Sequence, residues 1–463
     1  MFPRIEWGRS VDISRQHISV LSKVKQTFLR TETNRLLLTG SVSSLILRTV
    51  GIALRLAIGI VLARILGADG YGIYAYAIAW VGLLSMPSAL GLDQVLVRYV
   101  AAYREKSSWA PLKGLIRFSS GLGLAAGLVV GVVSVAVVAS LSGMQRELQL
   151  TLWAVFIVLP AVVGVQLWQA ALRGLDRPAR AVLLESVSYP VCLLAFSWVL
   201  YLVIGPEITA PHVALANAAS WLITFALGLM LLLLNIPAPV RQAVPSYEKS
   251  MWLDMVPPLV FIGFLTHVLL RADVLVMGIV STTADVGIYT AASRAAEMIQ
   301  FVEEAMMLAG ASLFSRIYAS GNIEELQRFV TLISRAILGF TVPVYVVFMV
   351  AAPWIMGIFG DEFVRGAAVM RLLTTTHLLG NLGGFVMVML YMVGRPRDVA
   401  VAVGFAAALS VALSLLLIPK FGIMGAGIAH GVSLLLLKAS LVVVLYKRVG
   451  VVSLPFRFRG KTL

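Results

Sequence analysis

The chain has 463 residues, of which 60% are hydrophobic and only 13% are charged. Soluble domains are roughly half apolar and a quarter charged, so this composition excludes an ordinary soluble protein and indicates an integral membrane protein. The net charge is +15, but the basic residues lie mostly between apolar runs, which is typical of cytoplasmic membrane loops and not of a nucleic-acid-binding surface. The single cysteine, Cys192, excludes an intramolecular disulfide and a cysteine-based metal site.

Residues 1–35 are basic and precede the first apolar run. They lack the apolar core of a signal peptide, so we expect a cytoplasmic segment and not a cleaved leader. Ile18, Leu21, Val24 and Phe28 fall at helical spacing opposite basic residues. This pattern favours either a basic amphipathic helix on the inner leaflet or a disordered basic tail.

Windows of about 20 apolar residues predict about twelve membrane-spanning helices. In chain order they cover residues 40–63, 71–92, 115–141, 150–172, 181–204, 212–234, 254–280, 286–314, 331–351, 364–393, 399–418 and 423–446. The stretch 351–360 is either the end of the ninth helix or a re-entrant piece. Alternate connections hold most of the lysines and arginines, so both termini are expected in the cytoplasm, with the protein in the cytoplasmic (inner) membrane.

A short repeat relates the two halves of the chain. Residues 72–75 have the sequence Gly-Ile-Tyr-Ala and residues 287–290 have Gly-Ile-Tyr-Thr, while Arg-Pro at 177–178 reappears at 395–396. Each copy stands at an equivalent point of a six-helix half, and an even number of helices gives parallel repeats about an axis along the membrane normal. We therefore expect an all-α polytopic protein with two pseudo-symmetric six-helix lobes. The lobes cover residues 36–235 and 254–446, with a cytoplasmic linker at 236–253 and a basic cytoplasmic tail at 447–463.

Four arginines lie inside predicted membrane helices, where a charge is costly unless it faces a polar cavity or a partner. Arg48 and Arg55 are one heptad apart on one face of the first helix, which contains no acidic residue. Arg55, Arg271 and Arg294 each fall about 12 to 15 Å below the outer surface, close to the bilayer midplane. We expect the four to line a central path. For Arg294 the alternative is a pair with Glu297, three residues on.

Acidic residues near these arginines are candidates for ion coupling or for static pairing. Glu297 and Glu304 are one heptad apart on the eighth predicted helix, and Asp273 follows Arg271 by two residues, which directs it to the opposite side of its helix. Such carboxylates either exchange protons during transport or hold arginines in a fixed network.

Other polar residues of the C-terminal half are candidates for lining the same path. They are His267, His377, Asn381, His430 and Lys438. For the histidines the alternative is hydrogen-bonded packing, and for Lys438 it is snorkelling to the cytoplasmic interface.

The sequence contains no enzymatic constellation. It has neither a phosphate-binding glycine loop with its lysine nor a paired-histidine metal motif, and the connections are too short to build a soluble active site. We therefore expect no catalytic residue, no cofactor and no bound metal, with H+ or Na+ as the candidate coupling ion.

Three stretches resemble Wzx-type polysaccharide exporters of the multidrug/oligosaccharidyl-lipid/polysaccharide (MOP) superfamily. They are residues 62–74 (LARILGADGYGIY), residues 271–273 together with 287–292, and residues 418–429 (IPKFGIMGAGIA). The resemblance implies a MATE/MOP-like fold and the flipping of an undecaprenyl-pyrophosphate-linked oligosaccharide through a cationic central cavity. On that resemblance Arg48, Arg55, Arg271 and Arg294 would bind the substrate. The implied partners are the lipid-linked oligosaccharide, membrane lipids, and a polysaccharide polymerase with glycosyltransferases.

Two other functions stay open at this stage. A cation-coupled multidrug exporter of the same superfamily is disfavoured because the first helix is doubly basic and free of acid. A scaffold that organises a glycan-assembly complex without transporting anything is compatible with the sequence. Lipid II flippases of the MurJ type usually carry two further C-terminal helices, which this chain lacks.

Overall fold

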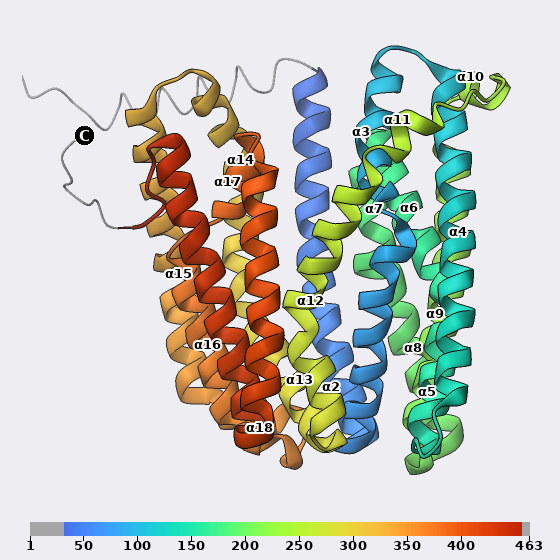
Figure 1. Ribbon diagram of the computed structural model, residues 1–463, viewed down its shortest axis with the longest axis vertical. Coiled ribbons are helices and arrows are strands. Elements are labelled where there is room, and N and C mark those ends of the chain that lie inside the picture. The colour runs from blue at the N-terminus through green and yellow to red at the C-terminus, as the bar shows by residue number, and fades with distance from the viewer. Residues whose placement is uncertain (1–31, 456–463) are drawn as a thin grey trace, which may run out of the picture.

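The computed structural model describes residues 32–455, with side chains from residue 46 onward except at 258, 308, 309 and 312, and this part of the chain is helical without strands (Figure 1). Nine helical stretches within it are long and apolar enough to cross a membrane. Two of them fold back on themselves at Gly67 and Gly422, and the interrupted helix of residues 283–319 completes twelve spans. The predicted all-α membrane fold is confirmed. The proposed amphipathic segment of residues 1–31 lies outside the described residues.

The N-terminal lobe contains six spans. α2 (Glu32–Ala89) supplies two of them, because Gly67 has φ 67° and ψ −177° and turns the chain back. The second span continues as α3 (Leu92–Glu105). The remaining spans are α4 (Trp109–Ser140), α5 with α6 (Arg146–Phe156 and Leu159–Gly174), α7 with α8 (Pro178–Leu183 and Tyr189–Ile204, joined by a π-helical turn at Leu184–Ser188), and α9 (Ala210–Asn235).

The C-terminal lobe follows a linker made of the short helices α10 (Ala238–Gln242) and α11 (Lys249–Leu253). Its spans are α12 (Val256–Val280), α13 with α14 (Thr283–Glu297 and Phe301–Ala319), α15 (Ile323–Phe359), α16 with α17 (Ala367–Asn381 and Val386–Met392), and the two halves of α18 (Pro396–Val449). The stretch 351–360 is therefore the end of α15 and not a re-entrant piece. After α18 the chain returns to its own lobe, where the Val452 N–H donates to Gln327 Oε1 at 2.8 Å.

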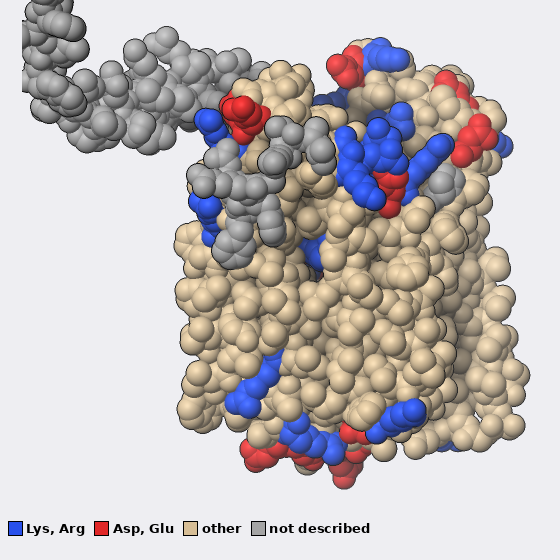
Figure 2. Space-filling model, turned by 60° about the vertical axis from the view of Figure 1, so that its left-hand side comes forward, with Lys and Arg blue, Asp and Glu red and all other residues tan. Residues whose placement is uncertain are grey.

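The two ends of the bundle carry different features. One, which we call the hairpin end, holds the turns at Gly67 and Gly422 and lies at the bottom of Figure 1. The other, the basic end, holds α10, α11 and the predicted cytoplasmic loops with Lys106, Arg177 and Arg395. Between them, charged residues are nearly absent from the face drawn in Figure 2, which is the apolar belt expected of a bilayer-spanning protein.

The repeated Gly-Ile-Tyr motifs meet at the interface between the lobes. Gly72 of α2 and Gly287 of α13 pack so closely that a Cβ added to Gly72 would lie 2.9 Å from the Gly287 nitrogen and 1.8 Å from the Thr283 carbonyl oxygen. A Cβ added to Gly287 would lie 2.1 Å from the Ala68 carbonyl oxygen. Only glycine permits this approach of two backbones, so the repeat marks the place where the lobes touch.

Hydrogen bonds close the hairpin end around this contact. Thr283 Oγ1 donates to Asp69 Oδ1 at 2.5 Å, and the Ala68 N–H donates to Glu362 Oε2 at 2.9 Å. Arg64 Nε donates to the carbonyl oxygen of residue 358 at 2.6 Å. The first hairpin of the N-terminal lobe is thereby tied to two hairpins of the C-terminal lobe.

Candidate functional site

Three cavities adjoin one another near the centre of the molecule, with volumes of about 360, 130 and 200 Å³. The first is lined by residues of the C-terminal lobe, and the other two lie between the lobes. The first two share Glu297, Gln300 and Glu304, while Arg271 and Arg294 connect them to the third. We call the three together the central cavity. Figure 2 shows a hollow in the upper half of the molecule with a basic side chain inside it.

An arginine cluster surrounds Glu297 at the centre of this cavity. Glu297 is the last residue of α13, and a 3₁₀ turn at Met298–Gln300 follows it. Its carboxylate lies 3.9 Å from Arg271 Nη1 and 3.7 Å from Arg294 Nη1. The pairing that the sequence offered for Arg294 is therefore present, but the same carboxylate also serves Arg271 on α12.

The cluster carries more positive than negative charge. Two guanidinium groups share one carboxylate, and Arg55 of α2 lines the same cavity as Arg294 and Glu297. The side chains of Arg271, Arg294 and Glu297 are 28%, 32% and 38% exposed, so the group is reachable from the cavity. A partly desolvated cluster with surplus guanidinium groups is suited to charge-assisted hydrogen bonds with an anion.

Arg48 stands apart from the other three arginines. It is half-buried and is not among the residues that line the central cavity. At this level α2 leans on the π-helical turn of the N-terminal lobe, where a Cβ added to Gly51 would lie 2.5 Å from Ser186 Cβ. A substrate role for Arg48 stays a prediction.

Asp273 belongs to a second polar cluster, inside the C-terminal lobe. It is buried and accepts hydrogen bonds from Tyr289 Oη at 2.5 Å and from the Val274 N–H at 2.8 Å. His430 Nδ1 of α18 lies 3.1 Å from Asp273 Oδ2. The partners of Asp273 therefore come from α13 and from the last helix, and Arg271 pairs with Glu297 instead.

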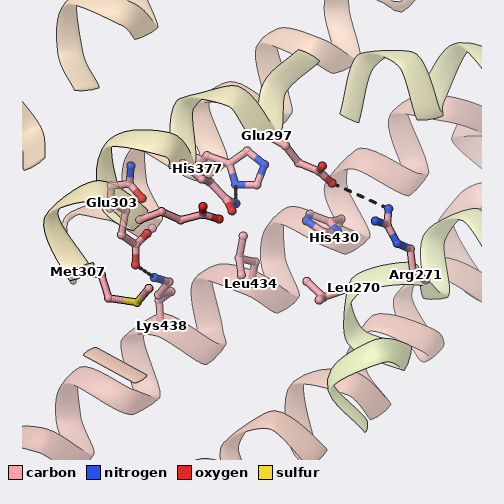
Figure 3. Close-up of a pocket in the computed structure, with 13 residues that line it drawn as sticks. Leu270, Arg271, Glu297, Glu303, Met307, His377, His430, Leu434 and Lys438 are labelled. Carbon is pink, nitrogen blue, oxygen red and sulfur yellow. Dashed lines mark hydrogen bonds and ion pairs between the residues drawn. The ribbon is translucent and has the colours of Figure 1, made fainter. Parts of the chain in front are cut away.

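The wall opposite the arginine cluster carries a third set of contacts (Figure 3). Lys438 Nζ of α18 donates to Glu303 Oε1 of α14 at 2.6 Å and to the Gly384 carbonyl oxygen at 3.3 Å. With its amide turned to donate, Asn381 Nδ2 lies 2.7 Å from Glu303 Oε2. The snorkelling alternative for Lys438 is wrong, because a carboxylate within reach holds the ammonium group inside the lobe.

The remaining candidates also reach the central cavity. His377 lines it, with its Nδ1 2.6 Å from Gln300 Nε2. His267 lines it one helical turn from Arg271, and its Nδ1 is buried without a hydrogen-bond partner among the described residues. Glu304 is exposed to it.

The central cavity, predicted to be cationic, contains acidic residues as well as basic ones. Its basic lining residues are Arg55, Arg271, Arg294 and Lys438, and its acidic ones are Glu297, Glu303 and Glu304. All three carboxylates lie on α13 and α14, toward the basic end. Of the described residues that line the compartment nearer the hairpin end, two are arginines, one is a histidine, two are tyrosines and none is acidic.

Tyrosines of the cavity were not among the predicted site residues. Tyr71 and Tyr74 line the compartment nearer the hairpin end. Asn217 Nδ2 of α9 donates to Tyr74 Oη at 3.1 Å, which fixes that ring in place. Tyr74 belongs to the repeated Gly-Ile-Tyr motif, which is the signal in the sequence that could have found it, whereas Tyr71 lies just before the motif.

Comparison with known proteins identifies a family whose model matches this chain. A family model described as "Polysaccharide biosynthesis protein" matches residues 37–314. A relative from Haloferax volcanii, a probable low-salt glycan biosynthesis flippase, is 27% identical over 165 residues, which are 35% of this chain and 34% of that protein. The match thus spans about a third of the relative's length.

Solved structures show the same fold at low sequence identity. An inward-facing multidrug resistance MATE family transporter of the MOP superfamily has a TM-score of 0.72 at 14% identity, covering 89% of this chain and 98% of its own. A MOP superfamily transporter from Pyrococcus furiosus has a TM-score of 0.63 at 14% identity, covering 91% and 97%. An outward-facing MATE transporter has a TM-score of 0.61 at 15% identity, covering 89% and 95%.

Proposed function

We propose that this chain, which belongs to the polysaccharide biosynthesis protein family, moves an anionic lipid-linked oligosaccharide across the cytoplasmic membrane. In this proposal the substrate is an oligosaccharide on undecaprenyl pyrophosphate, and it enters at the basic end and leaves at the hairpin end. The basic end faces the cytoplasm, because its loops hold most of the lysines and arginines.

The observation that carries the proposal is the arginine cluster around Glu297. A pyrophosphate needs fixed cations in a path of low dielectric constant, and two guanidinium groups within 4 Å of a single carboxylate leave one positive charge uncompensated. Arg55 adds a further positive charge from the opposite lobe, in a cavity that Glu304 also lines. Tyr71 and Tyr74 in the adjoining compartment offer ring faces and hydroxyl groups to sugar rings.

The contacts at the hairpin end support a mechanism of alternating access. In this structure the lobes are joined there by the Gly72–Gly287 contact and by the hydrogen bonds of Asp69 and Ala68. We propose that they separate at this end when the substrate leaves. Glu304 and Asp273, with its neighbour His430, are the candidates for coupling this motion to H+ or Na+, since neither carboxylate belongs to the arginine cluster or to the Lys438 ion pair.

A flipping assay in proteoliposomes tests the proposal. The purified protein is reconstituted with a fluorescent polyprenyl-pyrophosphate oligosaccharide, and flipping is followed as the fraction of fluorophore that an external reductant reaches. Arg55→Gln and Arg271→Gln should each slow flipping at least tenfold. Both should insert normally, because removing a charge from the membrane interior lowers the insertion cost.

The matched control is Arg316→Gln, which removes an exposed charge at the end of α14 and should flip at the wild-type rate. Wild-type rates in both cavity variants would overturn the assignment of the arginine cluster. A wild-type protein that does not flip the lipid at all would overturn the proposed function.

A second candidate function, export of cationic drugs, is favoured by the carboxylates of the cavity. Glu304 in particular is exposed to it. Under that function the same vesicles should transport a cationic dye, and Glu304→Gln should abolish the transport. A pure scaffold of a glycan-assembly complex would move neither the dye nor the oligosaccharide.

A further inference from the structure

The outer side of the N-terminal lobe carries a groove that is separate from the central cavity. α4 and α9 both pack on α6, and a cavity of about 560 Å³ lies between them. Its floor is Trp168 of α6, which donates a hydrogen bond to Ser120 Oγ at 3.2 Å and packs on Phe225 with ring centroids 4.4 Å apart. It shares no lining residue with the central cavity.

Most of the groove is apolar and open to the surrounding bilayer. Leu229 and Leu233 line it and leave 38% and 54% of their surface exposed. Gly164 lies beneath Phe225 and Leu124, where a Cβ would stand 2.6 Å from the Phe225 ring and 3.1 Å from Leu124 Cδ2. A larger residue at this position would push both side chains outward, so glycine keeps the groove deep.

The end of the groove nearest the basic end of the molecule is cationic. Lys113, Arg117 and Arg241 line it, and none of its lining residues is acidic. Lys113 Nζ donates to the carbonyl oxygens of Arg241 and Ala243 at 2.5 and 2.8 Å, which brings the linker against α4. Arg117 stands one helical turn from Lys113 and is exposed.

We propose that this groove binds an anionic phospholipid of the leaflet at the basic end. The phosphate lies among Arg117, Lys113 and Arg241, and an acyl chain runs along Phe225 over Trp168. The order of charge and apolar surface along the groove matches the order of phosphate and acyl chain in a lipid. Basic pockets between helices on the cytoplasmic side are known to take such headgroups.

A lipid bound at this site connects two parts of the chain. Arg241 belongs to α10, the first helix of the linker that joins the two lobes. A phosphate bridging Arg241 and Arg117 fastens this linker to α4 of the N-terminal lobe. The inference does not rest on the proposed transport function, because the groove and the central cavity have no residue in common.

Native mass spectrometry of the full chain tests the proposal. The protein is released from nanodiscs that contain equal amounts of phosphatidylglycerol and phosphatidylcholine, and the retained lipids are counted. The wild type should retain phosphatidylglycerol preferentially, and Arg117→Gln should lower that preference about fivefold, the contribution of one basic side chain near a membrane surface. Arg180→Gln, which removes an exposed charge at the same end of the same lobe, should leave it unchanged.

A second variant separates the apolar part of the site from its charge. Leu229→Trp fills the groove without altering any charge, and it should reduce the retention of phosphatidylglycerol while the thermal stability of the delipidated protein stays at the wild-type value. Equal retention of both lipids by the wild type would overturn the headgroup site. Wild-type retention in both Arg117→Gln and Leu229→Trp would overturn the groove, and complete displacement of phosphatidylglycerol by an equimolar polyprenyl phosphate would overturn the assigned occupant.

Discussion

Replacing Gly72 with alanine should force the lobes apart at the hairpin end. The added Cβ would lie 1.8 Å from the Thr283 carbonyl oxygen and 2.7 Å from the Thr283 carbonyl carbon. Carbon and oxygen atoms of packed backbones approach no closer than about 3.3 Å, so α2 and α13 must separate by about 1.5 Å at this point. Because the obstructing atoms are backbone, no side-chain rotation relieves the clash.

The penalty falls on the hairpin-closed state alone. Overpacking a tight contact costs about 1–3 kcal/mol, and the clash disappears once the lobes part. A bias of this size changes the ratio of open to closed molecules by about 5- to 150-fold. In a helix without such a contact, glycine to alanine instead stabilises by about 0.5–1 kcal/mol.

Distances between spin labels measure the opening. Cys192 is replaced by serine, and labels are attached to cysteines at Ser142 and Lys420, which are exposed at the hairpin end of opposite lobes. The Gly72→Ala variant should gain a population at longer distance. The matched control is Gly121→Ala in α4, where nothing lies within 4 Å of the added Cβ. An unchanged distance distribution for Gly72→Ala, with stability raised as in the control, would refute the reasoning.

Three further outcomes test the polar contacts and the orientation. Glu297→Gln removes the carboxylate that two arginines share, so it should strengthen binding of inorganic pyrophosphate in isothermal titration and lower thermal stability in detergent; weaker binding would contradict the anion site. Lys438→Met leaves Glu303, which is 17% exposed, without its ion-pair partner, and it should lower the free energy of unfolding by about 3–5 kcal/mol. The double variant Lys438→Met/Glu303→Gln should recover most of this loss. An additive loss in the double variant would count against a buried pair. In intact cells that produce the protein without Cys192, an impermeant thiol reagent should label a cysteine introduced at Ser142 and spare one introduced at Ser320. The opposite labelling pattern would mean that the basic end faces outward.

The sequence alone was sufficient for the membrane fold. A span must bury about 20 apolar residues and satisfy its own backbone hydrogen bonds, so hydropathy located all twelve spans. Their bounds were less certain, since the ninth was predicted at 331–351 and α15 covers Ile323–Phe359. Hydropathy missed the interruptions inside the spans, such as the 3₁₀ turn at Met298–Gln300, because a local loss of one hydrogen bond leaves no trace in it. The rise of a helix predicted a similar depth for Arg55, Arg271 and Arg294, and in the structure all three line the central cavity.

Only the tertiary structure decided which charges meet. Heptad spacing shows which face of its own helix a residue occupies, but not which helix stands opposite that face. Asp273 meets His430 because α18 packs against α12, and the same helix brings Lys438 to Glu303 of α14. Glu297 reaches Arg271 for a similar reason, since the rotation and depth of α13 depend on how its helix packs against its neighbours, including the close contact at Gly287. These partners lie far apart along the chain, and their distances result from packing that no local pattern encodes.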